Sequence, residues 1–284
     1  MFVKHGFVTK KDNIQVFRKS KYVQSDMGDC FLKVKEFLEQ GHQVIFSGTP
    51  CQVAGLKSFL NKNYEKLFCI DFICHGVGSP KIFEDWLKHL SKYYKSEIIR
   101  YTFRVKHICF GKLDTYISSY EFKNGQKVQV SQDLYVSAFI KQLSHRKSCG
   151  ESCRYRHQNR FSDITIGDFK NQSDVFPELK ETRNLSTIIF NTKKGLILFE
   201  GISGLMTVMP CDVSAIEQYN SLFFHQTSEN LDRKAFFEDY TNGMEIYDLL
   251  SKYYIKPHKN IKSKIFIFIP YWIKYKLKQF FKYK

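Results

Sequence analysis

Two short apolar segments in the first third of the chain are each followed by a loop that contains cysteine, glycine and proline. The first segment is Val44-Ile-Phe46, which Gly48 and Pro50 interrupt, and the second covers residues 67–73. Short apolar runs are typical of buried strands, and a proline cannot continue a central strand. With a helical segment at about 52–60 between them, they predict a βαβ unit, which is expected to be right-handed.

Helical spacing of apolar residues predicts two further helices around this unit. One follows residues 19–25, is capped by Asp26 or Asp29 and ends at Gly41. Its buried stripe consists of Phe31, Val34, Phe37 and Leu38. The other covers residues 81–94, with Phe83, Trp86, Leu87 and Leu90 facing inward.

Residues 98–130 change to a period of two, which is typical of strands with one buried face. Asn124-Gly125 lies between two alternating segments and predicts a β-hairpin. We also expect strands at 14–17, 164–166 and 186–192 and helices at 133–143, 194–201, 235–240 and 244–253. The predicted fold class is α/β: a mixed sheet with a βαβ core, a β-hairpin insertion and a basic, amphipathic helical tail at the C-terminus.

The tail changes how the net charge of +16 is interpreted. Residues 249–284 contain ten lysines and no acidic residue, which leaves about +6 for residues 1–248. We therefore expect two parts, an α/β domain over 1–248 and a tail over 249–284. In the tail, apolar and lysine side chains follow two helical faces, as in a helix that lies in a membrane interface. The alternative is a helix docked on the body. No nucleic-acid-binding module is recognisable, so we expect no nucleic-acid partner.

Eight cysteines are present, and residues 1–6 show no apolar signal-peptide segment. We therefore expect a cytoplasmic protein whose cysteines serve metal binding, redox chemistry or the core. Four cysteines have polar loop surroundings that contain glycine or proline, and they could ligate a [4Fe–4S] cluster or a structural zinc ion. They are Cys51, Cys74, Cys149 and Cys153. The other four have apolar or irregular surroundings, which favour core roles.

Polar residues near these cysteines are the other candidates. His75 could act as an acid or donate to a cofactor, or it could be a hydrogen-bonded structural residue. Arginines in the segment after residue 145 could bind phosphate or carboxylate groups, or form a solvated basic face. Asp163 and Asp168 could anchor these arginines or cap turns. The arginines are Arg146, Arg154 and Arg160.

Several stretches together resemble the family of coenzyme F420 hydrogenase/dehydrogenase beta subunits, in particular a bacterial branch associated with polysaccharide biosynthesis. The stretches are Lys19-Ser-Lys-Tyr-Val-Gln-Ser25, Phe46-Ser-Gly-Thr-Pro-Cys-Gln-Val-Ala-Gly-Leu56, Asp71-Phe-Ile-Cys-His-Gly76 with Ser79-Pro80, and Arg160-Phe-Ser-Asp-Ile-Thr-Ile-Gly-Asp168. Weaker matches continue to about Tyr240, in the same order.

The resemblance implies an α/β oxidoreductase that binds FAD and a [4Fe–4S] cluster and passes electrons to coenzyme F420 or another deazaflavin or flavin acceptor. It also implies an electron-donor protein or ferredoxin-like chain as partner. By the same resemblance, the four loop cysteines become the preferred cluster ligands, and Gly48, Thr49, His75 and Gly76 become candidates for lining the flavin. His75 is also the candidate catalytic residue, because of its possible role as an acid. The other candidate cofactor-binding residues are Arg146, Arg160, Asp163 and Asp168.

The sequence departs from the family pattern in three ways. Family members carry an N-terminal ferredoxin-like segment, which we expect this chain to lack. Cys149 and Cys153 are separated by three residues, where two are common in the family. Lys170 stands where family members have an aromatic residue. The leading hypothesis is the redox enzyme, located in the cytoplasm or on the inner face of the membrane. The second is a truncated, non-catalytic accessory module with structural or zinc-bound cysteines. The third is a nucleic-acid or membrane-surface binder that depends on the tail.

Overall fold

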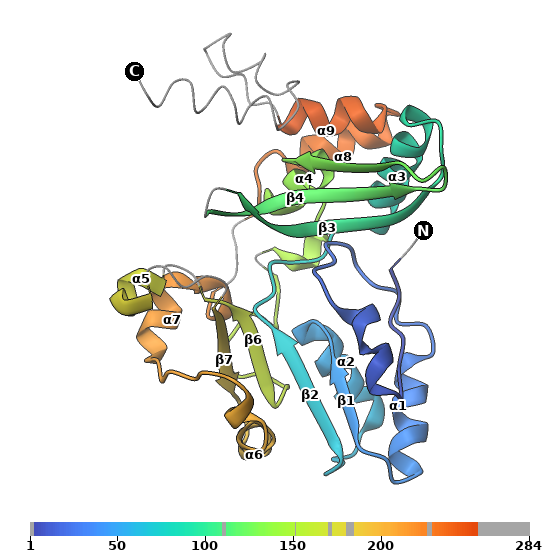
Figure 1. Ribbon diagram of the computed structural model, residues 1–284. Helices are drawn as coiled ribbons and strands as arrows, with labels where there is room; N and C mark the ends of the chain where they lie inside the picture. The colour runs from blue at the N-terminus through green and yellow to red at the C-terminus, as the bar shows by residue number, and fades with distance from the viewer. Residues whose placement is uncertain are drawn as a thin grey trace.

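The computed structural model describes residues 3–109, 112–150, 152–169, 172–179, 185–225 and 229–254. They form two β-sheets with their own helices, and in Figure 1 the three-stranded sheet lies above the four-stranded one. The fold is therefore mixed α/β, as predicted. Most of the tail, residues 255–284, lies outside the described residues.

The four-stranded sheet contains the predicted βαβ unit. Strands β1 (Val44–Ser47), β2 (Leu67–Phe72) and β6 (Ile164–Asp168) are parallel, and β7 (Ser186–Phe190) pairs antiparallel with β6. The apolar stripe of α1 (Cys30–Glu39) and the apolar side of α2 (Pro50–Leu60) pack on β1 and β2. Strands β2 and β6 are far apart in the sequence, but because they are adjacent and parallel, their C-terminal ends lie at the same edge of the sheet.

The three-stranded sheet is the predicted hairpin region. Strands β3 (Ile98–Cys109), β4 (Lys112–Phe122) and β5 (Lys127–Ser131) are antiparallel, and Gly125 has φ +84° in the turn between β4 and β5. A large core of aromatic and aliphatic side chains packs between this sheet and its helices. The helices are α3 (Pro80–Tyr93), α4 (Leu134–Ile140), α8 (Arg233–Thr241) and α9 (Ile246–Tyr254).

Short elements complete the described chain. The α-helices are α5 (Gln172–Val175), α6 (Lys193–Glu200) and α7 (Val213–Tyr219). The 3-10 helices are η1 (Lys11–Phe17), η2 (Lys147–Cys149), η3 (Pro177–Leu179), η4 (Ser203–Leu205) and η5 (Ser221–Phe223). Within the described ranges, no helix is both long enough and apolar enough to cross a lipid bilayer.

Three local expectations differ from the structure. The predicted strand at 14–17 is wrong: these residues belong to η1, whose side chains are exposed and gain nothing from strand-like burial. The helix predicted for 133–143 ends at Ile140, and Gln142 then takes a left-handed φ of +63°. Helix α7 had not been predicted. Leu249 and Leu250 belong to α9 and are buried in the core, while the division of the chain at residue 249 stays a prediction.

Candidate functional site

The first loop of the site joins β1 to α2. Thr49 caps α2 by a capping box: its backbone N–H donates to Gln52 Oε1 at 2.9 Å, and Gln52 N–H returns a bond to Thr49 Oγ1. Pro50 occupies the first turn, where its missing N–H costs nothing. Cys51 therefore lies at the helix N-terminus, as predicted; its side chain is exposed, and its Sγ is 3.0 Å from Thr49 Oγ1.

The second loop joins β2 to α3 and has the same design. Ser79 caps α3 with its hydroxyl, and Pro80 begins the helix. Between strand and cap, Cys74 is buried and Gly76 has φ +125°. A Cβ on Gly78 would come within 2.8 Å of a backbone carbonyl, so only glycine fits there.

The third segment reaches these loops through backbone pairing. Ser79 N–H donates to Ser144 O at 2.8 Å, and Arg146 N–H donates to Val77 O at 3.1 Å, around a bridge between Gly78 and His145. This short antiparallel pairing fixes the segment that carries Cys149 and Cys153 beside the Cys74 loop.

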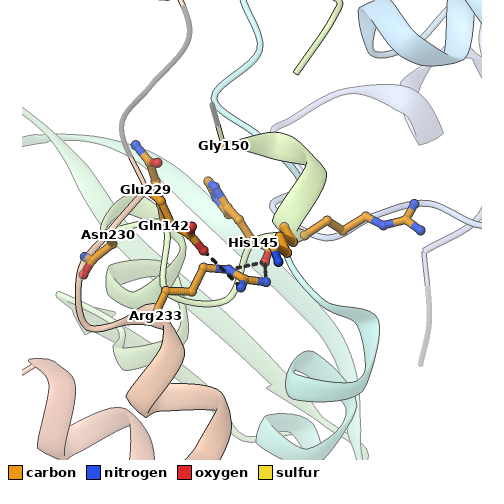
Figure 2. Close-up of a pocket in the computed structure, with 8 residues that line it drawn as sticks. Gln142, His145, Gly150, Glu229, Asn230 and Arg233 are labelled. Carbon is orange, nitrogen blue, oxygen red and sulfur yellow. Dashed lines mark hydrogen bonds and ion pairs between the residues drawn. The ribbon is translucent and has the colours of Figure 1, made fainter. Parts of the chain in front are cut away.

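Helix α8 holds the same segment from the other side. Arg233 donates from Nε and Nη2 to the carbonyl oxygen of His145, at 3.1 and 2.8 Å, and Figure 2 shows this contact at the edge of a small pocket. Its Nη1 pairs with Glu229 at 3.3 Å. Two elements that are distant in the sequence therefore fix the position of the cysteine-bearing segment.

The four predicted cysteines lie within electrostatic range of one another. The pKa of Cys74 is raised to about 12, mainly by burial and also by Cys51 and Cys149, while the amide of Gly76 and the charge of Arg156 act in the opposite direction. Burial also raises the pKa of Cys149, to which Cys51 and Cys153 contribute. Electrostatic interactions therefore connect thiols from three segments of the chain, and their role as ligands stays a prediction.

Their arrangement is open. In the described part of the chain, no group of three or more His, Cys, Asp or Glu side chains is close enough together to hold one metal ion. A zinc ion bound at about 2.3 Å by four sulfurs would place them within about 4 Å of each other. A [4Fe–4S] cluster places each cysteine on a different iron atom, so its sulfurs lie farther apart.

Two buried arginines border the cysteines. Arg156 donates from Nη2 to His75 O at 2.6 Å and lowers the pKa of Cys74. Arg160 has a side chain that is 1% exposed and pairs with buried Asp71 at 3.6 Å. Arg160 Nε and Nη1 have no hydrogen-bond partner among the described residues. Because Nη1 faces Asp71 Oδ2 across this ion pair, Nε is the guanidinium donor left without a protein partner in the described ranges.

The two histidines of the site differ in their partners. His75 Nε2 lies 3.0 Å from the carbonyl oxygen of Ile140, which gives this ring a structural contact. His145 is 3% exposed, stacks edge-on against His75 and Phe139, and neither of its ring nitrogens has a hydrogen-bond partner in the described ranges. Sequence reasoning passed over His145, although it opens the polar segment that carries two of the predicted ligands.

We expect His145 to make the protein less stable in acid. Burial, followed by His75, Arg156 and Arg233, lowers its pKa to about 3. The unfolded chain takes up this proton near pH 6.5 and the folded one does not, so stability falls as pH decreases below 6.5. Between pH 8 and pH 5, this proton uptake should lower the free energy of unfolding by about 2 kcal/mol.

Urea unfolding at pH 8, 6.5 and 5 measures this effect, and His145→Gln should lose this part of the pH dependence. The exposed His42→Gln variant is the control and should behave as the wild type. An identical pH dependence in His145→Gln and wild type would contradict the expectation.

The other predicted cofactor residues have packing or pairing contacts. A Cβ on Gly48 would meet Gln52 and Phe46 at 3.1–3.2 Å. Arg146 is exposed beside the site. Asp168 is 67% exposed and pairs with Arg104 at 2.9 Å, across the two sheets.

Asp163 is buried and joins three elements of the fold. Its carboxylate accepts from Cys69 N–H and Thr192 Oγ1, each at 2.8 Å, and lies 3.5 Å from Lys194 Nζ. Asp163 therefore anchors the sheet to the start of α6, a role that the sequence had not suggested.

Taken together, the fold and the site define a mixed α/β protein in which two cysteines follow parallel strands and two others lie in a segment that pairs with the second loop. Residues 41–205 match the family described as the C terminus of the coenzyme F420 hydrogenase/dehydrogenase beta subunit. The match covers more than half of the 284 residues, so the chain belongs to this family. It includes all four cysteines of the site. No curated protein matches the chain.

Proposed function

We propose that this protein is a redox module in which Cys51, Cys74, Cys149 and Cys153 hold a [4Fe–4S] cluster. The observation that carries the proposal is backbone pairing: residues 77–79 pair with 144–146, which places the segment of Cys149 and Cys153 beside the Cys74 loop, and adjacent strands β1 and β2 lead into the loops of Cys51 and Cys74. The family supports the same class of function, an oxidoreductase related to F420 hydrogenase and dehydrogenase beta subunits.

The chain's residues have separate tasks in this proposal. Cys74 provides a buried ligand, whereas Cys51 is exposed at the helix N-terminus, so the site has a buried side and an open side. Arg156 and Arg160 provide positive charge and N–H donors against the negative charge of four thiolates. A bound cluster would accept and give up single electrons. Because thiolates bind metal, loading must release protons, and cluster assembly should be favoured by higher pH.

The flavin, the acceptor and the wider role rest on the family. The proposal includes FAD bound near Gly48, Thr49, Gly76 and His75. It also includes electron transfer to coenzyme F420 or another deazaflavin, and a role in polysaccharide biosynthesis. An electron-donor protein as partner and a location in the cytoplasm or at the inner membrane face are further parts of it. The expected membrane contact of the tail concerns residues outside the described ranges.

Anaerobic purification with visible spectroscopy and iron, zinc, sulfide and flavin analysis tests the proposal. We expect about four irons and four sulfides per chain, with broad absorbance near 400 nm. Cys74→Ala should lose most of the iron, because it removes the buried ligand. Cys211→Ala is the matched control: Cys211 lies outside this group of cysteines, and its replacement should leave the iron content unchanged.

The outcomes separate the alternatives. Iron without flavin would support the cluster and direct the search toward a second chain that completes the flavin site. Zinc without iron would overturn the proposal in favour of an accessory module with a structural metal. Equal iron loss in Cys74→Ala and Cys211→Ala would contradict the ligand assignment.

A further inference from the structure

The four-stranded sheet has one face that lies under helices and one that is largely uncovered. Phe46 on β1 and Cys69 on β2 are paired in register and lie in the core beneath α1 and α2. The residues that precede them in the two strands, Ile45 and Phe68, are also paired in register. Because successive residues of a strand point to opposite faces, Ile45 and Phe68 lie on the other side of the sheet. We call this side the open face.

Each of the four strands exposes one large apolar side chain on the open face. Phe72 follows Phe68 on the same face of β2, and Ile166 is its partner in β6. Phe190 lies two residues after Ile188, the partner of Ile166 in β7. Alternate residues of a strand share a face, so these side chains point the same way. The four exposed side chains are Ile45 (62% exposed), Phe72 (40%), Ile166 (43%) and Phe190 (37%).

Helix α6 covers one end of the open face. Phe199 of α6 contacts Phe190, with 4.9 Å between the ring centroids, and a Cβ on Gly195 would lie 3.0 Å from Ile164, which is buried. In Figure 1, α6 lies at the lower ends of β6 and β7. Two residues after Ile164, Ile166 is already exposed, so this cover is short. Parallel strands are usually covered on both faces, which indicates that a further contact covers the rest.

The charges favour a second copy of this chain as the occupant. In the four described strands, Asp168 is the one charged residue on the open face, and it already pairs with Arg104 at 2.9 Å. A partner of opposite charge would therefore find little to recognise there. The chain carries a net charge of +16, so two copies repel each other where their charged surfaces meet. This repulsion is smallest at an uncharged face, where apolar side chains of two sheets can interdigitate.

The size of the open face predicts a reversible dimer. Four strands about 4.8 Å apart, with about five residues each and a rise of about 3.3 Å per residue, make a face of roughly 300 Å². A specific interface buries about 800 Å² on each partner. The surroundings of the face must therefore contribute to the contact, and its apolar centre is small enough for the two copies to separate on dilution.

We propose that the open face is the contact surface of a homodimer, in which the four-stranded sheets of two copies pack face to face about a two-fold axis. The same patch of both copies then meets itself, as in an isologous interface. The axis passes near the centre of the sheet, between β2 and β6, so Phe72 and Ile166 of the two copies lie close together. The dimer does not depend on the proposed cluster and should also form in the metal-free chain.

Sedimentation equilibrium of the full chain from about 1 to about 200 µM tests this inference, because the range covers weak association. The molar mass of the wild type should increase with concentration from that of one chain to that of two. Ile166→Lys should raise the dissociation constant by about tenfold or more, because it places two like charges in an apolar contact. Ile45→Lys, at the most exposed of the four positions, should also weaken the dimer.

Ile99→Lys is the matched control, because Ile99 is a 55% exposed isoleucine on β3 of the other sheet. It should leave the dissociation constant unchanged. An equimolar mixture of Ile166→Lys and Ile166→Glu should recover the dimer, because opposite charges then meet near the axis. Circular dichroism establishes that each variant is folded. If Ile166→Lys failed to fold, Ile45→Lys would still have to weaken the dimer relative to Ile99→Lys.

Three results would overturn the inference. A wild-type chain that stays monomeric at the highest concentration would leave the open face to the tail or to another protein. Equal weakening by Ile166→Lys and Ile99→Lys would place the contact on a different surface. A mixture of Ile166→Lys and Ile166→Glu that stays monomeric would contradict a two-fold axis at the centre of the sheet.

Discussion

Replacement of Asp163 by alanine should lower the free energy of unfolding by about 3–5 kcal/mol, the range for removing one partner of a buried charged network. The carboxylate satisfies the backbone N–H of Cys69, the hydroxyl of Thr192 and the ammonium of Lys194. These groups come from β2 and from the start of α6, so alanine would leave buried donors unpaired where the sheet meets the helix. Urea denaturation of metal-free protein measures the loss.

Asp168→Ala is the matched control for this prediction. Asp168 ends the strand that Asp163 precedes, but it is 67% exposed and pairs with a single arginine. Its loss should cost less than about 1 kcal/mol, as is usual for an exposed ion pair. Equal destabilisation by the two substitutions would contradict the structural role assigned to Asp163.

Gly76→Ala should destabilise the protein by about 2–4 kcal/mol, because two costs add. The backbone at Gly76 has φ +125°, which strains any side chain. An added Cβ would also meet the buried ring of His145 at 2.6 Å. Movement of that ring would disturb the segment that carries Cys149, so we expect iron loading to fall as well.

Gly125→Ala separates the two costs. Gly125 has φ +84°, but a Cβ there would meet no described atom within 4 Å. Its cost should be limited to backbone strain, about 1 kcal/mol, without a change in iron content. Unfolding curves and iron analysis for both variants measure the difference. A Gly76→Ala protein as stable and as iron-loaded as Gly125→Ala would show that the ring contact is unimportant.

The charges of the site illustrate how residues of the same type can have different roles. Asp71 belongs to β2 and Asp163 lies beside it, and both are buried; Asp71 pairs with Arg160, whereas Asp163 holds the sheet to α6. The sequence placed Asp163 among the cofactor candidates and did not single out Asp71. Only the contacts of each side chain distinguish the two roles.

Local sequence determined most of the secondary structure around the site. Thr49-Pro50 and Ser79-Pro80 each combine a capping hydroxyl with a proline that starts a helix, so both loops end where predicted. Asn124-Gly125 likewise set the hairpin, because a positive φ is needed in its turn. Where no such local signal existed, as at 14–17 and at α7, the expectations were wrong or missing.

The tertiary structure decided which of these loops meet. The spacing of Cys149 and Cys153 says nothing about Cys51 and Cys74, which lie 75 to 102 residues earlier. Their convergence depends on pairing of residues 77–79 with 144–146 and on Arg233 of α8. The same pairing buries His145 against Gly76. Such contacts depend on packing between distant elements, whereas caps and turns depend on a few neighbouring residues. The sequence alone therefore predicted the loops, and only the tertiary structure placed them next to one another.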